Sequence, residues 1–297
     1  MLPKVSIQIP TYNQAGLMEK AIQSCLAQDY QNLEIIVADD NSKDNTEEVV
    51  KKYLIDFRVK YFKNPINLGR VDNYRNALQN LVTGDWVINL DGDDYFAVHN
   101  FISDAINELL RDVNQDVVLY MAQNFYLKKI ARKFSIPIQN NFIKVNGLIF
   151  LENYSYFPHF LHLSSLFNRK AALEKNFYEK DSLNADFASL MQLADSGSFI
   201  ITDRKVGEWN VNENSASQTL DDVNNEKNIE AINFLVNNLT FKNDRQKRRT
   251  LDGLLYVNKY HLVSSYKKDV RSLFHFLKLL SFRNYYWRGI THFLIKK

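Results

Sequence analysis

The chain has 297 residues, of which 45% are hydrophobic and 24% charged, enough for one large α/β domain with an appendage or for two modest domains. Its formal net charge of +3 at pH 7 is too small to indicate a nucleic-acid-binding protein, and we expect no nucleic-acid partner. A single cysteine, Cys25, excludes a disulfide framework and a cysteine-based zinc site, which suits a reducing cytosol.

The first hundred residues alternate short apolar segments with amphipathic ones. The opening, MLPKVSIQIP, lacks the charged and apolar regions of a signal peptide. Strand-like segments occur at 4–10, 33–40, 59–64 and 85–91. Apolar residues recur at helical spacing in 17–28, 42–54 and 71–82. Strands that alternate with helices of this length predict βαβ units and a mainly parallel sheet, so the fold class is α/β and Rossmann-like.

Beyond residue 100 the alternation becomes less regular. Segment 100–112 is a good amphipathic helix, and 115–127 is a strand candidate. We expect 128–150 to be irregular because it mixes bases, Pro137 and short apolar pieces. Segment 159–168 resembles a strand. From residue 216 onward the pattern is helical, so we predict an α/β domain over 1–215, with halves 1–100 and 101–215, and a helical C-terminal extension over 216–297.

Polar residues follow three of the predicted strands at their carboxyl ends. They are Pro10-Thr11, Asp39-Asp40 and the acidic turn Asp91–Asp94. In open α/β sheets ligands bind beyond the carboxyl ends of the strands. These segments, which are distant in sequence, should therefore converge on one crevice.

The acidic turn, LDGDD (90–94), places three carboxylates within four positions. Like charges this close disfavour full ionisation unless a cation accompanies them. Oxygen ligands suit Mg²⁺ or Mn²⁺ rather than zinc, and such an ion would clamp a nucleotide diphosphate. From the turn alone, a solvated acidic loop remains an equal alternative.

The N-terminal part of the chain resembles the inverting glycosyltransferases of family 2, which have the GT-A fold. The resemblance is carried by PTYN, QDY, VADDNSKDNT and LDGDD in the family's order and spacing, together with NLGRVDNYRNA (67–77). It is specific over about residues 4–100, is traceable to about residue 217 and does not cover the rest of the chain.

The resemblance implies roles for the strand-end residues in binding a nucleotide. Pro10 and Thr11 would line the nucleobase site. Asp40 would accept a hydrogen bond from a pyrimidine N–H, and Asp39 would help to shape that turn. Arg75 would contact the base or the diphosphate, although on chemistry alone it could equally be a surface arginine.

The same resemblance assigns the acidic turn to the ribose and the metal. Asp91 would reach the ribose or the metal shell, and Asp93 would ligate Mn²⁺ or Mg²⁺ directly. Asp94 would be a supporting or structural acid.

An inverting transfer also needs a general base, because a sugar hydroxyl is a poor nucleophile. The resemblance points to Asp186, at the start of a helical pattern, although Ala185 stands where the family usually has Glu. Asp181 and Asp195 are competing candidates, and Asp186 could instead be only a helix N-cap.

Two further segments bear on the site. Asn212 occupies a loop position where many relatives carry His, and Trp209 in the same loop is expected to fill the core. His159 and His162 are three residues apart, so in a regular strand they would point to opposite faces. We therefore expect no shared metal there. For His159 we expect a structural role, and a place near the acceptor site stays open as the alternative.

The tail 267–297 contains eight Lys or Arg residues and one acid beside Tyr285, Tyr286 and Trp287. This pattern suits an anionic membrane surface, although a packed helix with a solvated basic edge would share it. We therefore expect a cytoplasmic protein, peripheral on the inner face of the cell membrane if the tail binds there.

Together these features predict a metal-dependent inverting glycosyltransferase of bacterial surface-polysaccharide type. It would move a sugar from a nucleotide diphosphate, with UDP as the expected nucleotide, to a glycan or lipid-linked glycan hydroxyl. Two alternatives stay open. One is a non-catalytic relative that binds nucleotide-sugar and acts as a membrane-associated scaffold. The other is a nucleotidyltransferase, although IPTYNQAGL is not the glycine-rich loop such an enzyme needs.

Overall fold

A computed structural model of the chain describes residues 2–122, 127–139, 141–154, 162–208 and 222–265. Several predictions therefore lie outside the described residues: those for His159, Trp209, Asn212 and the basic tail 267–297.

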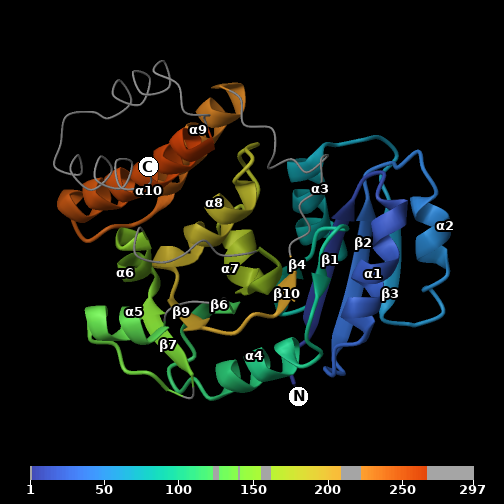
Figure 1. The fold of residues 1–297 in the computed structure, drawn as a ribbon, viewed down its shortest axis with the longest axis horizontal. Coiled ribbons are helices and arrows are strands. Elements are labelled where there is room, and N and C mark those ends of the chain that lie inside the picture. The colour runs from blue at the N-terminus through green and yellow to red at the C-terminus, as the bar shows by residue number, and fades with distance from the viewer. Residues whose placement is uncertain (1, 123–126, 140, 155–161, 209–221, 266–297) are drawn as a thin grey trace.

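The centre of the fold is a mixed sheet with eight strands in the described residues, in the order β3-β2-β1-β4-β8-β6-β9-β7 (Figure 1). The pairs β2–β3, β1–β2, β1–β4 and β6–β9 are parallel, and β8 runs antiparallel to β4 and β6. The strands are β1 Val5–Thr11, β2 Leu33–Asp39, β3 Val59–Lys63, β4 Trp86–Asn89, β6 Val117–Ala122, β7 Phe142–Asn146, β8 Ser165–Asn168 and β9 Ser198–Thr202. The predicted α/β class is confirmed.

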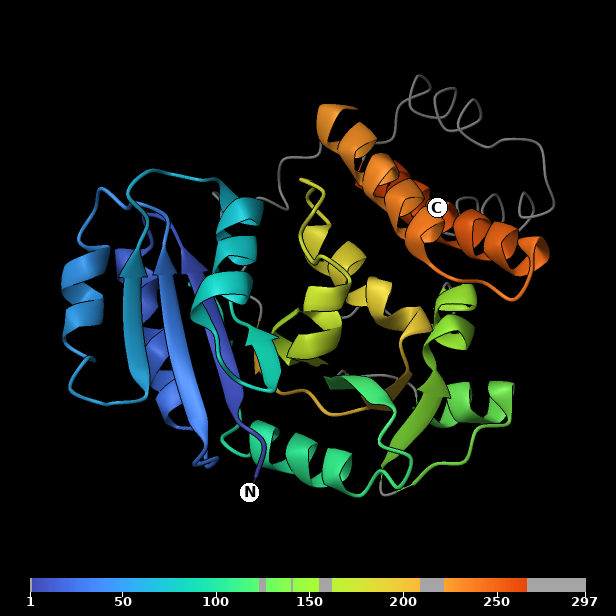
Figure 2. The ribbon, with the colours of Figure 1, turned by 180° about the vertical axis from the view of Figure 1, so that it is seen from behind.

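Helices cover both faces of this sheet. One face packs against α1 Ala15–Leu26, α2 Thr46–Lys51 and α4 Phe101–Leu110. The other face carries the remaining helices (Figure 2). They are α3 Arg70–Asn76, α5 Leu127–Phe134, α6 Gly147–Glu152, α7 Arg169–Glu174, α8 Ala185–Met191, α9 Asp222–Asn238 and α10 Asp244–Ser265.

The two-sided core follows from the alternation of side chains along the strands. In β2, Ile35 and Val37 join the core under α1, whereas Ile36 joins the core on the opposite face. Both faces are covered, so every residue of β1 and β2 is buried, as is usual for parallel strands.

The predicted helical extension is present in α9 and α10. Ile232 and Leu235 of α9 and Leu254 of α10 belong to the same buried cluster as strand residues such as Phe199. The extension therefore completes one face of the core. The boundaries at residues 100 and 215 stay a prediction, although the sheet itself continues across residue 100.

One prediction about the middle of the chain is wrong, and another is confirmed only in part. Segment 128–150 is not irregular: it contains most of α5, all of β7 and the start of α6. Its short apolar pieces are elements that bury one face each, so neither helical nor strand periodicity lasts long enough to be recognised. Within the described part of 159–168, only Ser165–Asn168 is a strand, and His162–Ser164 forms a 3₁₀ turn.

Among the described residues, no helix has both the length and the apolar character needed to cross a bilayer.

Candidate functional site

The predicted convergence of strand ends is present. Strands β2, β1 and β4 are neighbours, and Thr11 at the end of β1 lies in register with Asp39 at the end of β2. The acidic turn after β4 packs against the same place. A Cβ on Gly92 would contact the Gln14 side chain and lie 2.9 Å from Met18 Sδ and 3.0 Å from Thr11 Oγ1. Glycine at this position therefore lets the acidic turn approach the end of β1.

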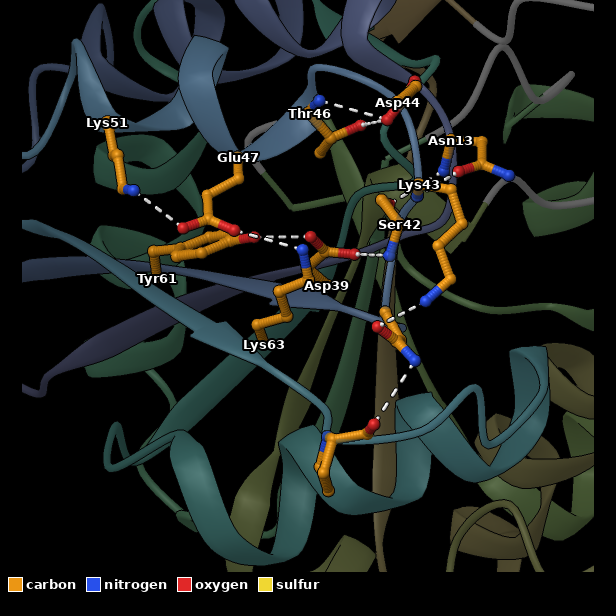
Figure 3. Close-up of polar contacts among 12 residues, drawn as sticks. Asn13, Asp39, Ser42, Lys43, Asp44, Thr46, Glu47, Lys51, Tyr61 and Lys63 are labelled. Carbon is orange, nitrogen blue, oxygen red and sulfur yellow. Dashed lines mark hydrogen bonds and ion pairs between the residues drawn. The ribbon is translucent and has the colours of Figure 1, made fainter.

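Reciprocal hydrogen bonds join the loops that follow β1 and β2 (Figure 3). The Asn13 amide donates to Ser42 Oγ at 2.9 Å, and the Lys43 amide donates back to Asn13 Oδ1 at 2.8 Å. Asn13 and Asn41 both have positive φ values, 53° and 65°, a conformation that asparagine tolerates better than most residues. The two loops thus form one fixed wall at the carboxyl edge of the sheet.

Asp39 and Asp40 are both buried, and each organises a different loop: Asp39 the loop after β2 and Asp40 the loop after β3. Asp39 Oδ1 accepts the Ser42 amide at 2.8 Å, and its Oδ2 accepts the Tyr61 hydroxyl (Figure 3). This contact agrees with the expectation that Asp39 shapes the turn.

Asp40 holds the loop that leads into α3. Its carboxylate accepts hydrogen bonds from Asn64 Nδ2 at 2.9 Å and from the amides of Leu68 and Gly69 at 2.8 Å each. Gly69 has φ +89°, a conformation that favours glycine. The contact between Asp40 and a pyrimidine stays a prediction.

The three acids of the turn lie in different environments. The Asp94 side chain is fully buried, whereas 30% of the Asp91 side chain is exposed and Asp93 is partly exposed. The Asp94 amide donates to the Asp91 carbonyl at 2.9 Å, which closes the turn. Asp91 Oδ1 also accepts the Tyr74 hydroxyl from α3. Asp91 and Asp93 are thus the two acids that a ligand can reach, which is compatible with the predicted metal role.

His162 lies among these acids, a position that the sequence pattern did not predict. Its Nε2 is 3.1 Å from Asp94 Oδ2 and 3.5 Å from Asp91 Oδ2. Its Nδ1 is 3.6 Å from Asp186 Oδ2. One imidazole therefore connects the acidic turn with the predicted general base.

Burial and neighbouring charges together set the pKa values of His162 and Asp91. Burial alone would lower the pKa of His162, but the carboxylates of Asp91, Asp94 and Asp186 outweigh burial and raise it to about 10. Burial raises the pKa of Asp91 to about 6, and the negative charges of Asp94 and Asp93 act in the same direction. The positive charges of His162 and Arg70 oppose that rise.

The position of His162 could have been inferred only from strand pairing. Strand β8 pairs with β4 antiparallel, with Trp86 opposite Asn168 and Ile88 opposite Leu166. Continuing that register puts residue 162 opposite Gly92, in the middle of the acidic turn. The rule that side chains alternate along a strand does not apply to His162, because it belongs to the 3₁₀ turn that precedes β8.

Asp186 lies in the first turn of α8, and its side chain is 23% exposed. It is not the N-cap, which is Asn184. The two competing acids point elsewhere. Asp181 Oδ2 accepts Lys227 Nζ at 2.6 Å, and Asp195 pairs with Lys175 and accepts the Thr240 amide at 2.8 Å. Of the three candidates, Asp186 is the one joined to the acidic turn through His162.

Arg75 faces the loop before α8. Its Nε donates to the Tyr178 carbonyl at 2.9 Å, and its guanidinium pairs with Asp72 at 3.0 Å. Its contact with a nucleotide stays a prediction. Arg70, which we did not predict, donates to the carbonyls of Ser182 and Leu183 at 2.7 and 3.1 Å. Its influence on the pKa of Asp91 marks it as a cation beside the acidic turn.

A divalent cation fits the ligands at this turn. Ligand atoms of Asp91, Asp94 and His162 all lie within 4.8 Å of one another. Ligands at right angles around an ion with bonds of about 2.1 Å lie about 3 Å apart, close to the separations found here. Asp93 adds a further partly exposed carboxylate. The residues therefore fit Mn²⁺ or Mg²⁺.

Comparison with known proteins identifies a family and a fold. The family described as Glycosyl transferase family 2 matches residues 6–172. GalNAc(5)-diNAcBac-PP-undecaprenol beta-1,3-glucosyltransferase of Campylobacter jejuni is 40% identical over 116 residues, 38% of this chain and 36% of that relative. UDP-Glc:alpha-D-GlcNAc-diphosphoundecaprenol beta-1,3-glucosyltransferase WfaP of Escherichia coli is 30% identical over 141 residues, 46% and 53% of the two chains. The matches thus span about a third to a half of these relatives.

Solved structures resemble nearly the whole chain. S. aureus TarS 1-349 in complex with UDP-GlcNAc has a TM-score of 0.66 at 16% identity, covering 94% of this chain and 82% of TarS 1-349. The mannosyltransferase PcManGT from Pyrobaculum calidifontis, in complex with GDP-Man and Mn²⁺, has a TM-score of 0.58 at 17% identity, covering 98% and 83%. At these identities the likeness concerns the fold, and it confirms the predicted GT-A architecture.

Proposed function

Because this chain belongs to glycosyl transferase family 2, we propose that it is a metal-dependent inverting glycosyltransferase. The donor would be a sugar linked to a nucleotide diphosphate, with UDP as the nucleotide. The acceptor would be a hydroxyl of a glycan or lipid-linked glycan. The main observation in support of the proposal is that Asp186 lies near the acidic turn, because His162 contacts both.

The nucleotide would lie on the wall formed by the loops after β1 and β2. Pro10 and Thr11 would line the base, and Asp39 and Asp40 would keep the loops in place through the hydrogen bonds described above. Arg70 and Arg75 lie on α3, at the edge of the site, where a guanidinium could contact the diphosphate.

In the reaction, Asp186 would remove the proton of the acceptor hydroxyl as its oxygen attacks the anomeric carbon. The bond from that carbon to the diphosphate oxygen breaks on the opposite face, and its electron pair leaves with the nucleoside diphosphate. Mn²⁺ or Mg²⁺ on Asp91 and Asp93 would supply Lewis-acid stabilisation of this departing charge. The product anomer would therefore be inverted.

The names of the two curated relatives support a lipid-linked acceptor, because both contain a diphosphate-linked undecaprenol. We propose the same class for this chain, in bacterial surface-polysaccharide synthesis. A protein that works on such an acceptor would be cytoplasmic and peripheral on the inner face of the membrane, with the basic tail 267–297 as the contact.

The proposal is tested by calorimetric titration of UDP, GDP and dTDP, each with and without Mn²⁺. We expect one nucleotide, UDP, to bind in a metal-dependent manner, and Asp93→Ala to remove that dependence. Glu174→Ala, which removes an exposed carboxylate on α7, is the matched control and should bind as the wild type does. Absence of nucleotide binding in every condition would refute the proposed function.

A further inference from the structure

His162 lies between the acidic turn and Asp186, with one ring nitrogen toward each. Nε2 lies 3.1 Å from Asp94 Oδ2, and Nδ1 lies 3.6 Å from Asp186 Oδ2. The His162 side chain is only 11% exposed. The hydrogen bond at Nε2 orients the planar ring, and the opposite edge then turns Nδ1 toward Asp186 at ion-pair distance.

The partner on the Nε2 side is itself rigid. The Asp94 side chain has no exposure, and its backbone amide is bonded to the Asp91 carbonyl within the turn. A buried carboxylate in a closed turn has little freedom to move, so it can serve as the fixed end of a chain of contacts. That chain runs from Asp94 through His162 to Asp186.

Asp186 is the other end of this chain of contacts, and it lies in the first turn of a short helix with part of its side chain open to solvent. A general base must lie within about 2.6–3.2 Å of the hydroxyl it deprotonates. A misplacement of about 1 Å can lower the rate about 10²-fold. A contact at Oδ2 would restrict the carboxylate and leave Oδ1 for the acceptor.

We propose that His162 is a positioning residue that orients the Asp186 carboxylate through Nδ1, while Asp94 holds the imidazole through Nε2. This inference rests on the proposed role of Asp186 as the general base. A role of His162 as a cation ligand would be different. Nε2 would then bind the cation together with Asp91, and the contact between Nδ1 and Asp186 would not affect the reaction.

Two amide substitutions separate these roles. In His162→Asn the side-chain amide lies near the former Nδ1 and can still donate to Asp186. In His162→Gln the amide reaches the former Nε2 and faces Asp91 and Asp94 instead. His99→Asn, at an exposed histidine, is the matched control. The probe is UDP-glucose with Mn²⁺, and UDP release into water is measured as kcat and KM beside calorimetric binding of UDP and Mn²⁺.

We expect kcat of His162→Asn to stay within about 10-fold of the wild type, and kcat of His162→Gln to fall by about 10²-fold. In both variants KM and UDP binding should change little. The opposite order of kcat, or a Mn²⁺-dependent loss of UDP binding in His162→Asn, would overturn the proposal and identify the imidazole as a cation ligand. Equal kcat in both variants and the wild type would also overturn it.

A second measurement does not depend on turnover or on stable His162 variants. In protein labelled with [¹⁵N]histidine, Asp186→Asn should shift the Nδ1 resonance of His162, whereas Asp181→Asn should leave it in place. An unchanged resonance in Asp186→Asn would refute the contact. If the wild type releases no UDP, the proposed function fails, and the resonance still decides whether His162 holds Asp186.

Discussion

Asp186 is the residue on which the proposed proton transfer depends, and its replacement isolates that step. Asp186→Asn keeps the size of the side chain and removes the base. We expect UDP release from UDP-glucose to fall by about 10²–10⁴-fold, with the dissociation constant of UDP and Mn²⁺ unchanged within error. Asp181→Asn, on the preceding loop and paired with Lys227, is the control and should keep wild-type turnover. Wild-type turnover in Asp186→Asn would assign the base elsewhere.

Gly92 tests the packing of the acidic turn against β1. In Gly92→Ala the added Cβ would meet the side chains of Gln14, Met18 and Thr11, so the turn must move away. We expect a loss of about 1–3 kcal/mol in the free energy of unfolding, together with at least 10-fold weaker Mn²⁺-dependent UDP binding. Gly16→Ala, where a Cβ meets nothing within 4 Å, is the control. Equal binding by the two variants would show that the turn position is not critical.

At this scale the sequence indicated the acidic residues of the candidate site and missed the two cationic ones, His162 and Arg70. Asp91, Asp93 and Asp186 could be proposed because strand ends and a known family order indicate them. His162 could not, since its place depends on the pairing of β8 with β4 and on a 3₁₀ turn that strand periodicity does not describe.

Strands β1, β2 and β3 are joined at their amino ends, opposite the site, by one buried carboxylate. Glu34 of β2 accepts Ser6 Oγ at 2.6 Å, Lys4 Nζ at 2.7 Å and Lys60 Nζ at 2.9 Å. It also accepts the Thr83 amide, just before β4, at 2.7 Å. Burial by itself would raise the pKa of Glu34, but these hydrogen bonds outweigh it and lower the pKa to about 2.

This shift predicts how stability depends on pH. The folded-state pKa is below the unfolded value, so the contribution of Glu34 is fully present above about pH 4.5 and is lost as the pH falls toward 2. In urea unfolding at pH 7 we expect Glu34→Gln to be less stable than the wild type by about 3 kcal/mol, and the difference to shrink steadily below pH 4.5. Exposed Glu174→Gln should show no such dependence. A difference that stays constant from pH 7 to 3 would contradict the assignment.

The elements that the sequence predicted well belong to a regular alternation of strand-like and helical segments, which identified even β3 and β4, with 5 and 4 residues. Strands β1 to β4 and helices α1 and α4 occupy the expected segments to within a few residues. Segment 128–150 was mistaken for irregular structure because α5, β7 and α6 have only 8, 5 and 6 residues. Elements this short are fixed by packing on a neighbouring face, which a local pattern does not contain.

Over the whole molecule, α9 and α10 belong to the same core as the sheet. Leu235 of α9 is fully buried in the cluster that also contains Phe199 and Ile201 of β9. We expect Leu235→Ala to cost about 2–5 kcal/mol and to shift the single unfolding transition of the protein. Val223→Ala, exposed on the same helix, should leave that transition nearly unchanged. A separate early transition for α9 and α10 in calorimetry would instead show that they unfold on their own.

The stereochemistry of turnover decides whether the protein transfers sugar from a nucleotide-sugar with inversion. The substrate is UDP-glucose, which is α-linked, and proton NMR follows the glucose that the protein releases with Mn²⁺ before it mutarotates. We expect β-glucose as the first product. We expect its release to be lost in Asp186→Asn. Release of α-glucose first would contradict inversion. A protein that binds UDP but releases no sugar from UDP-glucose or UDP-GlcNAc would contradict the proposed transferase activity.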